Sequence, residues 1–258
     1  MGLARPSVTG LGFLSGLVTR SIPVWPPSWP PGSIGVMTRS LDQINRHRER
    51  ARHDRADLDA VLDAGHHIGS LSTVVGGQPW VVPMLYGRSG DRILMHGSAG
   101  AGALRHVAAG APAALCVTHL DGWVYGHTLF NSSANYRSAV VHGELIELTG
   151  DEAAAALTRL SEGLTPGRSD EVPFHTKKQL AATTALAMEI AEGQWTVKVR
   201  DGGPGAPEDD EPEPEPGLWT GVLPIVTAYR APWTSDNVPA GTPVSPSVLK
   251  VLADSVVV

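Results

Sequence analysis

Between residues 66 and 148 the sequence breaks into short apolar runs separated by turn signals. The signals are Gly76-Gly77, Ser89-Gly90-Asp91 and Asp121-Gly122, and such residues between apolar runs favour tight hairpins. The predicted strands are Ile68–Val75, Trp80–Leu85, Arg92–His96, Ala113–His119, Trp123–Leu129 and Arg137–Leu148. Closely spaced antiparallel hairpins indicate a barrel or a sandwich rather than a doubly wound parallel sheet.

Helices are expected around and within this β region. Residues 39–64 have a helical pattern, and Thr149 with Glu152 and Thr176 with Gln179 have the spacing of a capping box. The predicted helices are Ala56–Ala64, Ala101–Ala109, Glu152–Gly163 and a segment from Thr176 through about Leu186, and two later strands are predicted at Trp195–Val199 and Trp219–Thr227. The result is a mainly β fold of the α+β class.

Composition excludes several kinds of protein. The 258 residues are 42% hydrophobic, which is enough to bury a core. The single cysteine, Cys116, excludes a disulfide framework or a multi-cysteine metal site. Of the 26 acids, six lie between Glu208 and Glu215, so the other 20 balance 20 basic residues. There is no broad basic field to indicate a nucleic-acid partner, and no long apolar run to indicate a membrane span.

Three parts are expected along the chain. Residues 1–36 are rich in proline and predicted to be disordered, residues 37–230 form the folded domain with an acidic loop at 202–217, and residues 231–258 are a C-terminal tail. The short apolar stretch Leu11–Val18 has no small-residue cleavage site after it, so a cytoplasmic protein is expected. Met37 is a possible alternative start of translation.

The densest cluster of small residues runs from His96 to Arg105, as His-Gly-Ser-Ala-Gly-Ala-Gly-Ala-Leu-Arg. It follows a predicted strand and opens a helix, where backbone N–H groups form an anion cradle or merely an ordinary turn. It does not match a dinucleotide-binding, Walker or nucleophile-elbow motif. The ten histidines show no zinc spacing, so no metal site is predicted, and Cys116 is expected to be buried.

Several stretches together carry a family resemblance. They are Val82–Gly87, Leu94–Gly100, Asn135–Ser138, Val140–Gly143, Pro166–Arg168, Lys198–Arg200 and Trp219–Pro224. In this order they resemble the pyridoxamine 5′-phosphate oxidase-like family of FMN-binding split barrels. The more similar branch is that of flavin-nucleotide-binding proteins, which is related to nitroimidazole-resistance proteins. The resemblance implies a six-stranded antiparallel split barrel with peripheral helices, built as a homodimer with the cofactor at its interface.

The resemblance also implies cofactor-binding residues. Pro83, Met84, Leu85 and Tyr86 would lie along the isoalloxazine, and His96, Gly97, Ser98 and Ala99 would lie toward the ribityl chain and phosphate. Arg105 would bind the phosphate, and Asn135, Tyr136, Arg137 and Ser138 would approach from the other subunit. No side chain is assigned as catalytic.

The function implied is FMN binding with hydride or electron transfer at flavin N5 to a small molecule not identified by the sequence. The alternatives are a nitroimidazole-type nitroreductase, a deazaflavin-dependent reductase, and a non-enzymatic flavin or haem carrier with His96 or His142 as axial ligand. The C-terminal region lacks the substrate-phosphate motif of true pyridoxamine phosphate oxidases, which argues against pyridoxal phosphate synthesis.

Overall fold

A computed structural model describes residues 40–98, 102–207 and 215–255. These described residues form one compact unit. The predicted disordered extension at 1–36 lies outside the described residues, as do Ala99 and the centre of the acidic loop.

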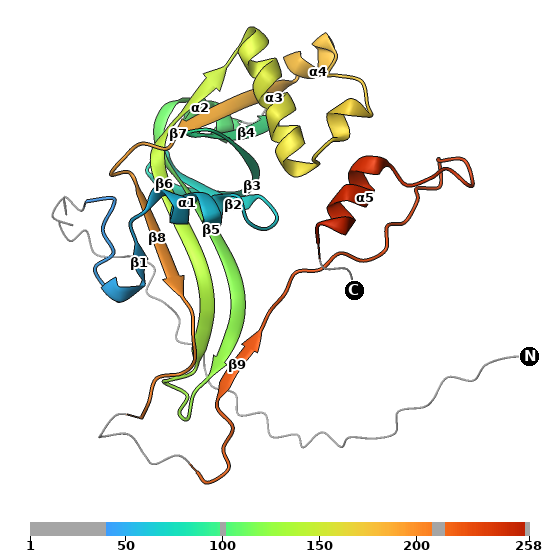
Figure 1. Cartoon of the computed structure of the whole chain (residues 1–258). Helices are drawn as coiled ribbons and strands as arrows, with labels where there is room; N and C mark the ends of the chain where they lie inside the picture. The colour runs from blue at the N-terminus through green and yellow to red at the C-terminus, as the bar shows by residue number, and fades with distance from the viewer. Residues whose placement is uncertain (1–39, 99–101, 208–214, 256–258) are drawn as a thin grey trace, which may run out of the picture. The chain divides into compact units, whose positions relative to one another are not determined.

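Six strands close into an antiparallel barrel (Figure 1). Their order is β6–β7–β4–β3–β2–β5, and β5 pairs back onto β6 to complete the ring. The strands are β2 (Ile68–Val75), β3 (Gln78–Ser89), β4 (Arg92–Ser98), β5 (Ala109–Tyr125), β6 (Ser133–Leu148) and β7 (Thr183–Glu189). The predicted six-stranded antiparallel barrel is therefore confirmed.

The barrel interior holds the main core. Alternate residues of each strand point inward, and Leu71, Leu115 and Val141 are fully buried there. Helix α1 (Arg55–Leu62) adds Leu58, together with Val61 and Leu62, to the same core. Burial of these side chains supplies most of the driving force for folding.

A second, smaller core lies outside the barrel under helix α3 (Gly150–Leu164). Leu157 and Leu160 of this helix pack on Leu94, Ala185 and Ala187 of the strands β4 and β7. Arg92 supports the contact because it binds both Glu189 of β7 and Glu152 of α3, at 2.6 and 2.8 Å. The remaining helices are α2 (Gly102–Ala108), α4 (Lys177–Ala181) and α5 (Pro246–Ala253).

Strands β5 and β6 extend beyond the barrel as a long curved ribbon (Figure 1). Strand β8 (Trp195–Arg200) pairs with the N-terminal half of β6, and β9 (Gly221–Pro224) pairs with the C-terminal end of β5. Beside β8 lies the two-residue strand β1 (Ala51–Arg52). No helix in the described part of the chain has the length and apolarity needed to cross a bilayer.

Two predictions of local structure are wrong. Asp121-Gly122 is no hairpin: β5 continues through it with an irregularity between Leu120 and Gly122, and Asp121 pairs with Arg137 of β6. The helix predicted through Leu186 ends at Ala181, and Thr183–Glu189 forms β7 instead. Five consecutive residues of β7 are buried, because the barrel core covers one face and α3 the other, so the strand lacks the usual alternation.

Residues 39–64 are also less helical than expected, since only Arg48–Arg50 and α1 form helical turns in the described part. The capping box at Thr176 and Gln179 is confirmed by both of its hydrogen bonds, whereas Thr149 makes no side-chain cap.

Candidate functional site

Strands β3 and β4 separate along one side of the barrel. They pair from Tyr86 with Met95 to Ser89 with Arg92. Beyond that point β3 pairs only with β2, and β4 only with β7, within the described residues. Backbone donors and acceptors that face this opening lack a strand partner, so the opening suits a ligand with a hydrogen-bonding edge.

The predicted ring-binding residues fall into two groups at this opening. Leu85 and His96 are the first residues beyond the paired segment, and both are exposed, as is Pro83. Side chains alternate across a strand, so Met84 and Tyr86 point toward the barrel core instead. Tyr86 is fully buried and its hydroxyl donates to the Leu62 carbonyl at 2.7 Å, while burial raises the pKa of its phenol.

The small-residue segment begins at the end of β4. A Cβ atom at Gly97 would lie 2.1 Å from Cδ1 of Leu104, so a larger residue there would force the Leu104 side chain of α2 to move. Ser98 ends β4 on the exposed side. The predicted phosphate-binding positions Ala99 and the side chain of Arg105 lie outside the part of the chain that the structure describes.

The predicted group on β6 is held within its own chain. The Asn135 amide donates to the Gly202 carbonyl at 3.0 Å and accepts from Arg200 at 2.7 Å. Arg137 makes a two-point ion pair with Asp121, at 3.0 and 2.9 Å, which raises the pKa of its guanidinium. The hydroxyl of Ser138 donates to a backbone carbonyl of β8 at 3.4 Å, and Tyr136 is half-buried. These residues lie on β6, which is separated from β3 by β2 and β5.

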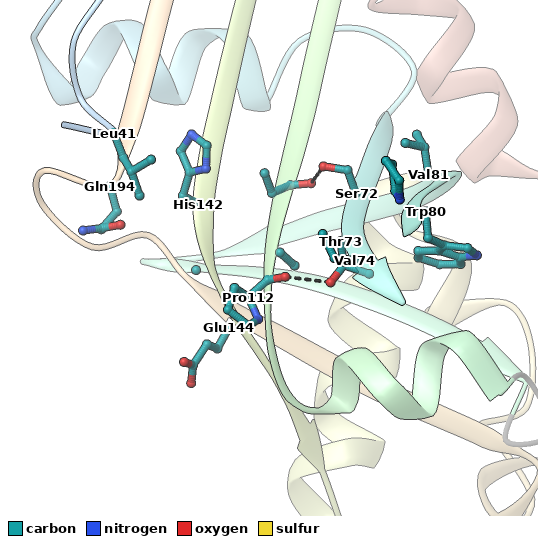
Figure 2. A pocket seen from close by; sticks show the side chains of 14 residues that line it. Leu41, Ser72, Thr73, Val74, Trp80, Val81, Pro112, His142, Glu144 and Gln194 are labelled. Atoms are coloured by element: carbon teal, nitrogen blue, oxygen red, sulfur yellow. Dashed lines mark hydrogen bonds between the residues drawn. The ribbon is translucent and has the colours of Figure 1, made fainter. Parts of the chain in front are cut away.

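A large pocket of about 590 Å³ lies on the outer face of the barrel (Figure 2). Its row of lining residues crosses four strands: Val81 opposes Ser72, Ser72 opposes Ala114, and Ala114 opposes His142. Val81 lies on one side of Ser72, and His142 and Leu41 lie on the other (Figure 2). Trp80 also lines the pocket, but it packs against the barrel core from the opposite face of β3. Sequence reasoning missed this pocket as a whole, although the small residues at alternate positions of two predicted strands are its signal.

The hydroxyls on the pocket floor are satisfied by the backbone. Ser72 donates to the Ala114 carbonyl at 3.2 Å, and Thr73 to the Pro112 carbonyl at 2.7 Å. His142 differs, because its ring has no hydrogen-bond partner among the described residues and burial lowers its pKa. The lining therefore combines an imidazole, the carboxylate of Glu144 and the amide of Gln194 with apolar residues.

Cys116 is exposed on this same outer face, contrary to the expectation of burial. Its neighbours Leu115 and Val117 take the inward positions of β5, so the alternation places the thiol outside.

The family is shown by comparison with known proteins. The family model described as pyridoxamine 5′-phosphate oxidase matches residues 54–196, more than half of the chain. The chain belongs to this family. The matched segment runs from the start of α1 into β8 and so includes all six strands of the barrel.

Two solved structures are similar to most of this chain. The FAD and haem binding protein from Mycobacterium smegmatis is 39% identical, with a TM-score of 0.74 over 78% of this chain and 96% of its own. The flavocytochrome Anf3 from Azotobacter vinelandii is 28% identical, with a TM-score of 0.72 over 80% and 94%.

A putative 5-nitroimidazole antibiotic resistance protein from Bacteroides thetaiotaomicron is 17% identical, with a TM-score of 0.50 over 58% of this chain and 86% of its own, and shares the fold. No curated protein sequence matches significantly.

Proposed function

We propose that this protein is a flavin-binding redox protein that also binds haem. The observation that carries the proposal is the 39% identity to a protein that binds FAD and haem, over 96% of that protein's length. The second similar structure, at 28% identity, is that of a flavocytochrome. When bound, a flavin supplies hydride or electron transfer, while the protein binds and orients it.

The opening between β3 and β4 fits a flavin. The isoalloxazine needs an apolar surface for its rings and backbone groups for its polar edge. Pro83 and Leu85 provide an exposed apolar strip, and the separation of the strands leaves backbone groups available beside it. His96 is the first residue of β4 beyond the paired segment, and its side chain lines a small pocket together with residues of α3 and α4. We assign this side chain to the polar end of the cofactor.

FAD is the flavin favoured for this chain, rather than the FMN expected from the sequence. The relative with 39% identity binds FAD, and its similarity extends over 78% of this chain, well beyond the barrel. The nitroreductase alternative has weaker support, because the nitroimidazole-resistance protein shares the fold at only 17% identity. The similar structures at 39% and 28% identity are a FAD and haem binding protein and a flavocytochrome, which favours a flavin over a deazaflavin.

We propose further that the protein is a homodimer that buries the outer face of the β2–β3 hairpin. Ile68, Val74 and Val81 point outward there and are more than half exposed, at 55%, 58% and 63%. A contiguous apolar surface of this kind is typical of an interaction site. An Ile68→Asp variant is expected to shift the molar mass measured by light scattering from dimer to monomer, whereas Ser70→Asp, a polar position of the same face, should shift it less.

The cofactor proposal is tested by releasing the bound flavin from purified protein with acid and identifying it by mass. Release of FAD in roughly equal molar amount to the protein supports the proposal. Release of FMN alone would reject FAD and identify the cofactor as FMN, the flavin predicted from the sequence. If the protein holds no flavin even after incubation with FAD or FMN, flavin binding is rejected.

A further inference from the structure

We infer that a pocket between the end of β4 and the helices α3 and α4 binds the adenine ring of FAD. The inference rests on the proposed binding of FAD and deepens it, because the adenylate is the part of FAD that FMN lacks. The pocket holds about 150 Å³. None of its described lining residues lies on the β2–β3 hairpin, whose outer face is the proposed dimer interface.

The walls of the pocket are leucine side chains of the second core. Leu157, Leu160 and Leu164 are three and four residues apart on α3, so they share one face of the helix. Leu180 of α4 adds a fourth leucine. Leu164 and Leu180 are only partly buried against this core, so the apolar layer is open at this end. A leucine-lined cavity of about 150 Å³ takes a flat aromatic ring such as benzene.

The polar part of the lining fits a ring that carries nitrogen atoms. The imidazoles of His96 and His175 and the hydroxyl of Ser161 line the pocket. The amide oxygen of Gln179 accepts from the backbone N–H and the hydroxyl of Thr176, at 2.8 and 2.9 Å, which leaves its NH2 group without a partner in the described chain. The edge of adenine offers an acceptor at N7 and an amino donor at N6. An amide NH2 group donates to the first, and a hydroxyl or a neutral imidazole accepts from the second.

A lack of charged groups sets this pocket apart from four others. Among the described residues, no carboxylate, ammonium or guanidinium group lines it. The outer-face pocket and three pockets of between about 180 and 270 Å³ each include at least one, such as Glu144, Arg92, Arg48 and Arg168 in turn. Burial of a charge without a partner is costly, so the pocket suits the neutral ring of a nucleotide and not its phosphates.

The pocket begins where the opening between β3 and β4 ends. His96 is the first residue of β4 beyond the segment paired with β3, and it lines the pocket. Thr183 of β7, which opposes Ser98 at the end of β4, lines it too. The ribityl chain and phosphate are expected beside His96 and Ser98, and in FAD the adenylate follows that phosphate. The adenine ring therefore comes within reach of a pocket at this end of the strand.

The test compares the affinities for FAD and FMN, because only FAD carries the ring that the pocket would bind. Full-length protein freed of flavin is titrated with each flavin by calorimetry. In Ser161→Phe the added ring fills the pocket, so the affinity for FAD should fall about tenfold or more while that for FMN changes by less than about twofold. Ala155→Phe, on the same helix but outside the pocket, is the matched control and should leave both affinities unchanged.

A conservative variant tests the polar contact. Gln179→Glu keeps an oxygen acceptor for the capping box at Thr176 but replaces the NH2 donor by a carboxylate. The affinity for FAD should fall about fivefold, the effect of one lost hydrogen bond, and the affinity for FMN should stay.

Competition tests the ring itself. AMP in excess should weaken the binding of FAD and leave the binding of FMN as it is. Ribose 5-phosphate, which lacks the ring, should weaken neither.

Several outcomes would overturn the inference. Equal affinities of the wild type for FAD and FMN would leave no role for an adenine pocket, and so would full FAD affinity in Ser161→Phe. If Ser161→Phe weakens both flavins, Gln179→Glu decides, and a loss of both or of neither in that variant rejects the pocket. AMP that does not weaken FAD binding, whether it binds beside FAD or not at all, would also reject it.

Failure of the inference is distinct from failure of the proposed function. Wild-type protein that binds FMN alone rejects the adenine pocket and leaves flavin binding standing, whereas protein that binds neither flavin rejects the proposed function.

Discussion

The two faces of the β2–β3 hairpin differ in how much they contribute to the fold. Leu71 and Tyr86 on the inner face are fully buried, whereas Ile68 and Val81 on the outer face are more than half exposed. The same strands thus hold the barrel together on one side and present an apolar surface on the other. A surface that stability does not require is available for a cofactor and a partner.

The largest effect should come from breaking the inner face. Leu71→Ala removes a fully buried side chain from the barrel core and should lower the free energy of unfolding by about 3 kcal/mol. Val81→Ala on the outer face should change it by no more than about 0.5 kcal/mol. Urea unfolding of the two variants, each measured without added cofactor, checks the difference. Equal losses would show that the outer face is also part of the core.

A second variant tests the point where the inner core reaches the proposed flavin site. Gly97→Ala places a methyl group against Leu104, and such overpacking should cost about 1–3 kcal/mol. Gly205→Ala is the control, because its added methyl group meets open space. Thermal unfolding of both variants provides the measurement, and an unchanged Tm in Gly97→Ala would contradict the close contact with α2.

The family resemblance places Tyr86 beside the flavin, whereas the structure places its side chain in the barrel core. Tyr86→Phe removes the buried hydrogen bond to the Leu62 carbonyl and should cost about 1 kcal/mol. The flavin spectrum should stay as in the wild type, since the hydroxyl faces α1. A shifted flavin band with unchanged stability would contradict this expectation and indicate that Tyr86 contacts the flavin.

The smallest effect is expected from His67, beside the β2–β3 hairpin, and concerns the loss of stability at acidic pH. His67 has a left-handed φ of 51°, its Nδ1 is buried without a partner, and burial lowers its pKa. The unfolded chain therefore binds a proton more readily, so stability falls as the pH drops below the ordinary value of about 6.5. His67→Asn, which tolerates the left-handed backbone, should lose less stability between about pH 7 and pH 5.

Urea midpoints at the two pH values provide this test, with His66→Asn as the exposed neighbour for control. The prediction fails if His67→Asn and the wild type lose stability in parallel.

Much of the barrel could be predicted because its signals are local. The turn at Gly76-Gly77 joins β2 and β3, and the bounds of β2 match the prediction Ile68–Val75. Strand β7 could not be recognised from its own residues, because it is buried on both faces and so lacks alternation. Its strand character follows from the packing of α3 outside the barrel, which is a tertiary effect.

The candidate site was predictable in part for a similar reason. The two segments that border the opening, Pro83–Tyr86 and His96–Ser98, carry the family resemblance and lie where β3 and β4 separate. Alternation decides which of their side chains face outward, and that requires the register of the strands. The outer-face pocket depends on the pairing of four strands, so no single motif marks it.

The visible absorption spectrum of the purified full-length protein tests the central claim most directly. The account predicts flavin bands that stay with the protein through gel filtration, together with a Soret band from haem. A protein that is colourless as purified and does not retain added FAD, FMN or haemin would contradict it.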